Sequence, residues 1–217
     1  MKIFQDLTIK GESAALERFV QEIEASLEEN WSRDRGLEEQ VKLLDKSPTW
    51  CFAFAGRGQE PAAFLWLMYQ EANKLYVPNI VPAGSERLSH EQYNGVLQDF
   101  YERFVKGAAR KTGVHAELGK DSFQLEDALS KASAESLHRF SALANKSTGS
   151  SHPRDRTRWE EFLISVHLEG STLDADTLER WLTEKEEWPA DKANQLAIEY
   201  EQAMYLLRAY DGRSRKT

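Results

Sequence analysis

The sequence predicts an α+β protein, with a mixed or antiparallel sheet and flanking helices in the N-terminal half and only helices in the C-terminal half. Two nearly continuous apolar runs, residues 50–55 and 62–69, are separated by turn residues, as in a β-hairpin. From Leu125 onward, apolar residues recur at helical spacing. The chain has 217 residues, 41% of them hydrophobic, and is therefore long enough to bury a core.

The N-terminal elements follow from local patterns. Residues 3–9 alternate between apolar and polar side chains, which predicts a half-buried strand. Ser13 is a suitable cap for the next helix, whose apolar residues keep helical spacing from Leu16 to Leu27. A shorter helix over Leu37, Val41 and Leu44 ends before position 48. Because the two hairpin strands lack alternation, we expect them to be central and covered on both faces.

A third strand over residues 74–81 contains Pro78. Proline cannot donate a hydrogen bond to a neighbouring strand, so we expect this strand to lie at an edge or to carry a bulge. Ser89 and Gln92 have the spacing of a capping box. The helix that they open ends near Gly107 or continues to Gly113, and residues 114–118 have the composition of a short strand.

The C-terminal half shows helical stripes over residues 125–132, 137–144, 159–166 and 178–182, and in a last helix of about residues 191–210. We therefore expect an α/β sandwich-like domain over residues 1–122 and a helical domain over residues 123–211 packed against it. Residues 212–217 are expected to form a frayed tail.

The overall charge is acidic, with 28 Lys and Arg against 36 Asp and Glu and a net charge of −8. Such a chain is a poor general ligand for nucleic acid or anionic membranes. No apolar stretch approaches the roughly 20 residues that span a bilayer, and the chain starts without the pattern of a secretory signal. The lone Cys51 lies in an apolar strand, which predicts a buried thiol that does not act as a nucleophile. These features predict a cytoplasmic protein without membrane association.

Residues 139–158 are the exception, because they contain five cations and only one acid, Asp155. Hydroxyl residues, a glycine and a following helix N-terminus are groups that hold a phosphate or carboxylate. Arg154 and Arg158 are four residues apart and on a helix can bind one anion together. The segment is either a solvated loop whose arginines pair with nearby acidic helices, which we favour, or a site for an anion or a partner. The residues assigned to this candidate site are Asn145, Lys146, Ser151, His152, Arg154 and Arg158.

The sequence contains no recognisable catalytic or metal-binding constellation. Its five histidines are widely spread, and it lacks a dinucleotide-binding glycine motif, a Gly-x-Ser-x-Gly motif and a Walker loop. We therefore expect no catalytic residue, no metal and no cofactor. An arginine–histidine ribonuclease site is disfavoured, because Arg158 and His167 are nine residues apart and would lie on opposite faces of one helix.

The order of one strand, two helices, three strands and a capped helix resembles the N-acetyltransferase superfamily, in which a bulged fourth strand opens to admit acyl-CoA. Residues 75–104 match that strand and the pyrophosphate-binding helix after it. The family signature Gln/Arg-x-x-Gly-x-Gly/Ala is not reproduced. Residues 83–89 contain a single glycine, Gly84, and an acidic residue, Glu86. The resemblance implies acyl transfer without identifying a catalytic residue. A ferredoxin-like α/β sandwich fits the same order of elements.

Acidic residues concentrate in two segments, nine in residues 12–39 and ten in residues 169–201. They form exposed helix faces or an interface that meets a basic partner. We expect a non-enzymatic acidic binding protein, similar to an immunity protein or an antitoxin, that recognises a basic protein. The alternatives are a diverged N-acetyltransferase-like enzyme and a defence-related protein that handles nucleic acid through residues 139–158.

Overall fold

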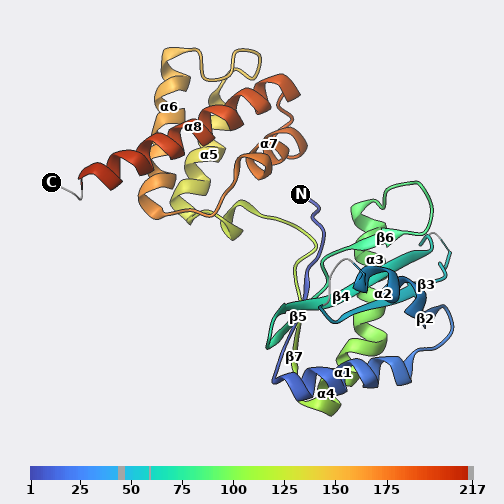
Figure 1. Ribbon diagram of the computed structural model, residues 1–217. Coiled ribbons are helices and arrows are strands. Elements are labelled where there is room, and N and C mark those ends of the chain that lie inside the picture. Colours follow the sequence, from blue (N-terminus) through green and yellow to red (C-terminus); the bar gives the residue numbers. More distant parts are fainter. Residues whose placement is uncertain (44–46, 59, 215–217) are drawn as a thin grey trace. The chain divides into compact units, whose positions relative to one another are not determined.

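The computed structural model describes residues 1–43, 47–58 and 60–214. The chain divides into two compact units, residues 2–122 and residues 123–217 together with Met1 (Figure 1). We call them the α/β unit and the helical unit. An antiparallel sheet with helices in the first unit and helices in the second confirm the predicted α+β class. Met1 belongs to the helical unit, where its carbonyl accepts a hydrogen bond from the Phe123 amide at 2.8 Å. The packing of one domain against the other stays a prediction.

The α/β unit contains an antiparallel sheet in the order β2-β3-β4-β5-β1-β7, and β6 pairs with β4. The predicted hairpin is formed by β3 and β4, whose ladder ends with Phe54 opposite Ala63. Gly56 in the turn has a φ of +86°, a conformation that favours glycine. Gln59, also in the predicted turn, lies outside the described residues. The strands are β1 (Leu7–Lys10), β2 (Trp31–Arg33), β3 (Thr49–Phe54), β4 (Ala63–Glu71), β5 (Lys74–Tyr76), β6 (Ile80–Pro82) and β7 (His115–Leu118).

The first two helices are α1 (Ser13–Ser26) and α2 (Arg35–Lys42). Glu12 is the N-cap residue of α1 and no side chain caps this helix, so the predicted Ser13 cap is wrong. Leu44, placed in the second helix from the sequence, lies outside the described residues. The short strand β2 between the two helices was not predicted, although its Trp31 is buried.

The capping box of Ser89 and Gln92 is confirmed by both of its hydrogen bonds, at 3.0 and 3.2 Å. The helix that it opens does not end near Gly107 but continues through a π-helical turn to Thr112, and Gly113 follows with a φ of +74°. Its parts are α3 (His90–Phe100), η1 (Tyr101–Val105) and α4 (Lys106–Thr112).

The predicted first strand begins later than its alternating pattern indicates. β1 starts at Leu7, because the side chain of Asn94 in α3 bonds the preceding backbone. The Gln5 amide donates to Asn94 Oδ1 at 2.9 Å, and Asn94 Nδ2 donates to the Ile3 carbonyl at 2.8 Å. Residues 3–6 therefore run along α3 outside β1.

The third predicted strand is divided into β5 and β6. Tyr76 lies opposite Met68, whereas Ile80 lies opposite Leu65. Three residues, 77–79, therefore face only residues 66 and 67 of β4, which is a β-bulge. The prediction of a bulge at Pro78 is confirmed, because the extra residue frees the proline from donating to the ladder.

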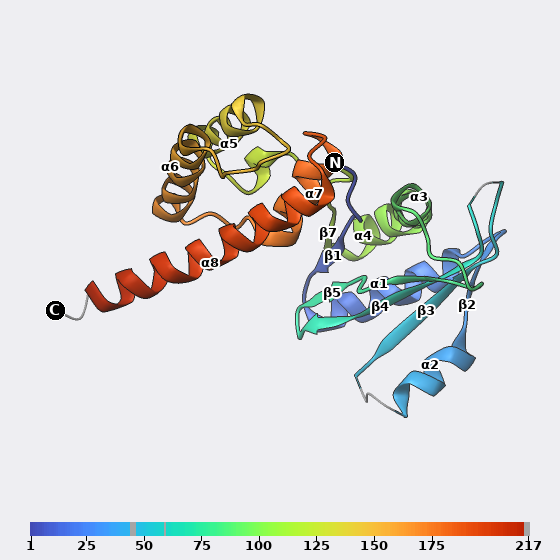
Figure 2. The same ribbon diagram turned by 90° about the horizontal axis from the view of Figure 1, so that it is seen from above.

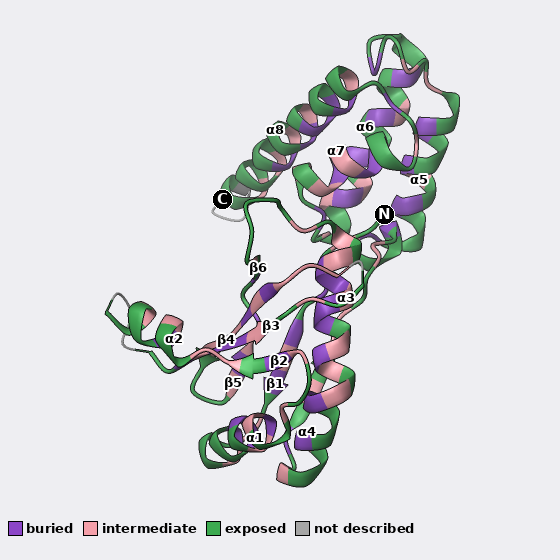
Figure 3. Ribbon diagram, turned by 90° about the vertical axis from the view of Figure 1, so that its right-hand side faces the viewer, coloured by how far each residue is buried: buried purple, intermediate pink, exposed green. Residues whose placement is uncertain are grey.

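The core of the α/β unit lies on one face of its sheet. Ile9, Phe52 and Leu65 share a cluster of buried side chains with α1, α3 and α4. On the other face of β4, Phe64 and Trp66 are only half-buried, and α2 lies on that side, opposite α3 and α4 (Figures 2 and 3). The predicted coverage of both faces is therefore wrong for β4. A continuous apolar run in the sequence does not show whether a helix covers both faces of the strand, because large apolar side chains can also remain half-exposed on one face.

The helical unit packs around Phe140, Trp159 and Phe162, with ring centroids 4.9 and 5.2 Å apart. Its last helix continues past the other helices of the unit (Figures 1 and 2). Residues 212–214 of the predicted frayed tail are helical, and residues 215–217 lie outside the described part. The elements are η2 (Leu125–Asp127), α5 (Lys131–Leu143), α6 (Pro153–Glu169), α7 (Ala175–Glu184) and α8 (Ala190–Ser214).

Candidate functional site

The basic segment, residues 139–158, covers the end of α5, the connection between α5 and α6 and the first turns of α6. Lys146 is held apart from the rest of the predicted site, because its ammonium donates to the backbone carbonyl of Glu186. The other predicted residues line one open cavity of about 630 Å³ at the start of α6. These residues are Asn145, Ser151, His152, Arg154 and Arg158.

The guanidinium of Arg158 is used inside the unit. Its Nη1 atom lies 2.7 Å from Oδ1 of Asp155, a residue that is only 6% exposed. The second oxygen of Asp155 accepts from the backbone amide of Asn145 at 3.4 Å. Arg158 therefore compensates a buried carboxylate, and the predicted joint binding of an anion by Arg154 and Arg158 would have to compete with this ion pair.

The three remaining cations of the segment are Arg139, Arg154 and Arg156, and only Arg156 forms an ion pair within the described residues. Arg156 lies 3.3 Å from Oε2 of Glu199, and the buried Ser150 hydroxyl donates to the same oxygen at 2.9 Å. Within the described part of the chain, Arg139 and Arg154 have no side-chain hydrogen bond or salt bridge. Only Arg156 among the cations of the segment pairs with an acid on another described helix, so the solvated-loop interpretation holds for Arg156 and the binding site stays a prediction.

The histidines near the segment have structural roles. His152 Nδ1 accepts from the backbone amide of Arg154 at 3.3 Å and so caps α6. His167 Nε2 lies 3.1 Å from Oδ2 of Asp211 in α8. Arg158 and His167 bind different carboxylates, so the structure does not assemble the disfavoured ribonuclease pair.

Most of the acidic side chains in residues 12–39 form ion pairs within the α/β unit. A hydrogen bond from Arg35, together with Arg33, lowers the pKa of Glu24 despite the opposing effect of burial. Glu38 is buried and accepts from Arg33 at 2.8 Å and from the Cys51 amide at 3.0 Å. The other pairs are Glu22–Lys111, Glu28–Arg103, Glu29–Arg103 and Glu39–Lys42.

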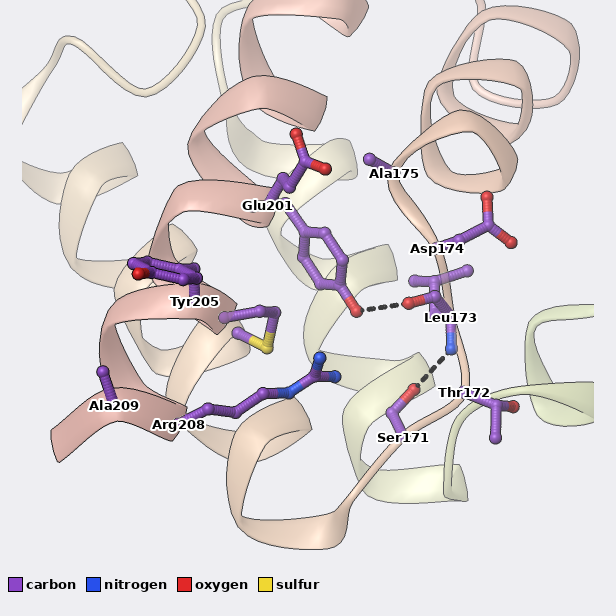
Figure 4. Close-up of a pocket in the computed structure, with 11 residues that line it drawn as sticks. Ser171, Thr172, Leu173, Asp174, Ala175, Glu201, Tyr205, Arg208 and Ala209 are labelled. Carbon is purple, nitrogen blue, oxygen red and sulfur yellow. Dashed lines mark hydrogen bonds between the residues drawn. The ribbon is translucent and has the colours of Figure 1, made fainter. Parts of the chain in front are cut away.

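A groove that the sequence did not predict lies beside α8 in the helical unit (Figure 4). It has a volume of about 650 Å³, and it is formed by residues 171–175, between α6 and α7, and by residues 200–209 of α8. Leu173 and Met204 are buried apolar residues that line it. The Tyr200 hydroxyl donates to the Leu173 carbonyl at 2.8 Å, and the Leu173 amide donates to Ser171 Oγ at 3.0 Å. These bonds attach the connection to α8 and shape the groove.

The Tyr200 hydroxyl remains a donor at neutral pH. Burial raises the pKa of Tyr200 to about 12, although the nearby positive charge of Arg208 opposes this rise. The polar group at the base of the groove is therefore fixed as a neutral phenol.

Charged residues of opposite sign lie toward the two ends of the groove. Glu201 and Asp174 lie toward one end, whereas Arg208 lies near Ser171 at the other (Figure 4). Asp174 also caps α7 by accepting from the Thr177 amide at 2.8 Å. Within the described residues, Glu201 and Arg208 form no side-chain hydrogen bond or salt bridge. Their charges are available to a ligand.

Large apolar side chains are exposed on the last turns of α8. Tyr205 lines the groove and is 77% exposed, and Leu206 and Tyr210 are 68% and 67% exposed. Figure 3 shows this end of α8 coloured largely as exposed. Several exposed apolar side chains on one helix are typical of an interaction surface. The buried stripe of α8 contains Ala193 and Met204, and the three exposed residues do not belong to it. Large apolar residues outside the helical stripe were therefore the sequence signal for this surface.

Three further observations concern the cysteine, possible metal ligands and membrane-spanning helices. Cys51 is fully buried, which confirms the predicted burial, and this burial raises the pKa of its thiol to about 12. In the residues that the structure describes, no cluster of three or more His, Cys, Asp or Glu is placed to hold a metal ion. None of the described helices combines the length and apolar character needed to cross a membrane.

The resemblance to the N-acetyltransferase superfamily stays a prediction. The bulge at residues 77–79 and the capped helix α3 occur in the order that the resemblance implies. In this sheet, however, β1 lies between β5 and β7.

Comparison with known proteins finds a match to a protein-family model. A family model described as a domain of unknown function (DUF1889) matches residues 129–207, about a third of the chain. The matched segment lies within the helical unit and contains most of the groove beside α8. No curated protein and no solved structure matches this chain.

Proposed function

We propose that this chain is a non-enzymatic binding protein that recognises a basic segment of a protein partner, in the manner of an immunity protein or an antitoxin. The groove of the helical unit is the proposed binding site. The observation that carries this proposal is the position of Glu201, which lines the groove and has no side-chain partner among the described residues.

Electrostatics supports a basic partner. Residues 169–201 contain ten acids and three bases, and they include Asp174 and Glu201 at one end of the groove. A lysine or arginine that enters there would form a charge-assisted hydrogen bond with Glu201. A surface with an excess of one charge also accelerates encounter with a partner of opposite charge.

The apolar part of the groove supports a protein partner rather than a free cation. Leu173, Met204 and the exposed Tyr205 provide a surface for an apolar side chain next to the partner's basic residue. Tyrosines beside a well-shaped groove are frequent hot spots of protein interfaces. Arg208 at the far end would pair with an acid of the same segment, which fixes the direction in which the segment lies.

The test measures binding of a short lysine–leucine peptide to the full chain by fluorescence anisotropy. Glu201→Gln should weaken binding by about tenfold, because one charge-assisted hydrogen bond is lost. The affinity of the unmodified chain should fall as the salt concentration rises. A glutamate–leucine peptide of the same length should bind much more weakly.

Glu161→Gln is the matched control, because Glu161 is exposed on α6, lies outside the groove and has no described side-chain partner. Equal losses in Glu201→Gln and Glu161→Gln would contradict the proposal, as would equal binding of the acidic peptide. Loss of RNA retention on Arg139→Ala with Arg154→Ala, without peptide binding, would instead favour a role in handling nucleic acid.

A further inference from the structure

A further cavity lies in the α/β unit, between β6 and the residues that precede β1. β1 pairs with β5, and the Val77 amide donates to the Leu7 carbonyl at 3.0 Å. Beyond the bulge, β6 continues along β4, while the residues before β1 are held on α3 by Asn94. The two segments therefore diverge, and a pocket of about 470 Å³ opens between them. This volume lies within the range of small-molecule sites, about 300–1,000 Å³.

Apolar and polar groups converge on this pocket. Phe4, Ile80 and Leu88 contribute apolar surface, and Phe4 remains half-exposed although its ring lies against Tyr93 at 4.7 Å between centroids. Tyr93 is only 7% exposed and lines the pocket, yet its hydroxyl has no hydrogen bond within the described residues. The ring is buried, but the hydroxyl oxygen is not among the buried polar atoms without a partner, so it is accessible from the pocket and can donate to a ligand.

Asp6 and Arg87 carry opposite charges and line the same pocket. In the described part of the chain, neither Asp6 nor Arg87 forms a side-chain hydrogen bond or salt bridge, with each other or with any third residue. Burial raises the pKa of Tyr93 to about 12, and the negative charge of Asp6 adds to this rise, so the carboxylate lies near the phenol. The pocket thus presents an acceptor, a cationic donor and a neutral hydroxyl donor.

We infer that this pocket binds a small zwitterion with an apolar body, of the size of an amino acid or a dipeptide. The ligand's ammonium group binds Asp6, its carboxylate binds Arg87 and accepts from the Tyr93 hydroxyl, and its side chain lies on Phe4, Ile80 and Leu88. A ligand with only one of the two charges would leave the opposite charge of the pocket without a partner. This binding is independent of the groove in the helical unit.

Isothermal titration calorimetry on the full chain tests the inference with four probes. Leucine and leucyl-leucine keep both charges, whereas N-acetyl-leucine lacks the ammonium group and leucinamide lacks the carboxylate. At least one of the two zwitterions should bind at millimolar concentration, and N-acetyl-leucine and leucinamide should bind at least about tenfold more weakly. The relative affinity of leucine and leucyl-leucine decides between an amino acid and a dipeptide.

Variants locate the binding. Arg87→Gln and Asp6→Asn should each weaken zwitterion binding by about tenfold, while Arg18→Gln, an exposed arginine without a described side-chain partner, should leave it unchanged. Amide resonances of Asn79 and Ile80 should shift on titration. The inference is overturned if neither zwitterion binds, if Arg18→Gln has the same effect as Arg87→Gln, or if acetyl-CoA alone shifts these resonances. Glu201→Gln should not change the result, which separates this site from the proposed function.

Discussion

The basic segment of residues 139–158 and the groove beside α8 both belong to the helical unit, but they use their charges differently. In the segment, Arg156 and Arg158 face Glu199 and Asp155 and so stabilise the fold, whereas Arg139 and Arg154 have no side-chain partner in the described part of the chain. In the groove, Glu201 and Arg208 have no such partners among the described residues. The comparison teaches that a concentration of charge in sequence does not indicate which charges remain available for binding.

The largest effect is expected at Asp155. Asp155→Ala removes the partner of Arg158 and the acceptor of the Asn145 amide, and should lower the free energy of unfolding by about 1–3 kcal/mol. Chemical denaturation of the full chain, followed by far-UV circular dichroism, measures this change. The matched control is Asp176→Ala, an exposed acid in the first turn of α7. An Asp155 variant as stable as this control would show that the basic segment does not stabilise the unit.

The groove should respond to alkaline pH. The pKa of Tyr200 is about 12 in the folded chain and ordinarily 10, so between these values the folded state holds the proton that the unfolded state loses. Stability is therefore retained below pH 10 and falls as the pH rises toward 12. Tyr200→Phe should make this fall shallower in denaturation curves recorded at several pH values. A slope unchanged from that of the unmodified chain would argue against a buried Tyr200.

A smaller loss is expected at Ser150. Ser150→Ala removes the hydrogen bond to Glu199 but leaves the contact of Arg156 with the same carboxylate. The expected loss is about 0.5–1.5 kcal/mol, the usual range for one intramolecular hydrogen bond. Ser151→Ala, at the exposed neighbouring serine, is the control in the same denaturation experiment. Equal stability of the two variants would mean that the Ser150 bond adds nothing.

The smallest effects should come from the groove charges themselves. Glu201→Gln and Arg208→Gln remove no described hydrogen bond or salt bridge, so each should change the unfolding free energy by less than about 0.5 kcal/mol. Thermal unfolding of these two variants, measured together with the Asp155→Ala variant, compares the three losses of stability. A large loss at Glu201 would assign this residue to folding and remove its availability to a partner.

Sequence patterns predicted the elements whose signals are local. The Ser89 capping box, the β3–β4 hairpin and the bulge at Pro78 follow from hydrogen-bonding rules within a few residues. The later start of β1 did not follow, because it depends on Asn94, which lies far away in sequence. The short β2 was missed because three residues are too few for a periodic pattern.

The sequence by itself determined the α+β class, the helical second half and the burial of Cys51, since each rests on periodicity or composition. Only the tertiary structure decided which charges are neutralised, because Glu199 and Glu201 are close in sequence yet only Glu199 faces Ser150 and Arg156. It also placed residues 171–175 beside α8, and it brought Asp6, Arg87 and Tyr93 to one pocket. Contacts between distant residues carry no local signal, so a binding surface built from them emerges only on folding.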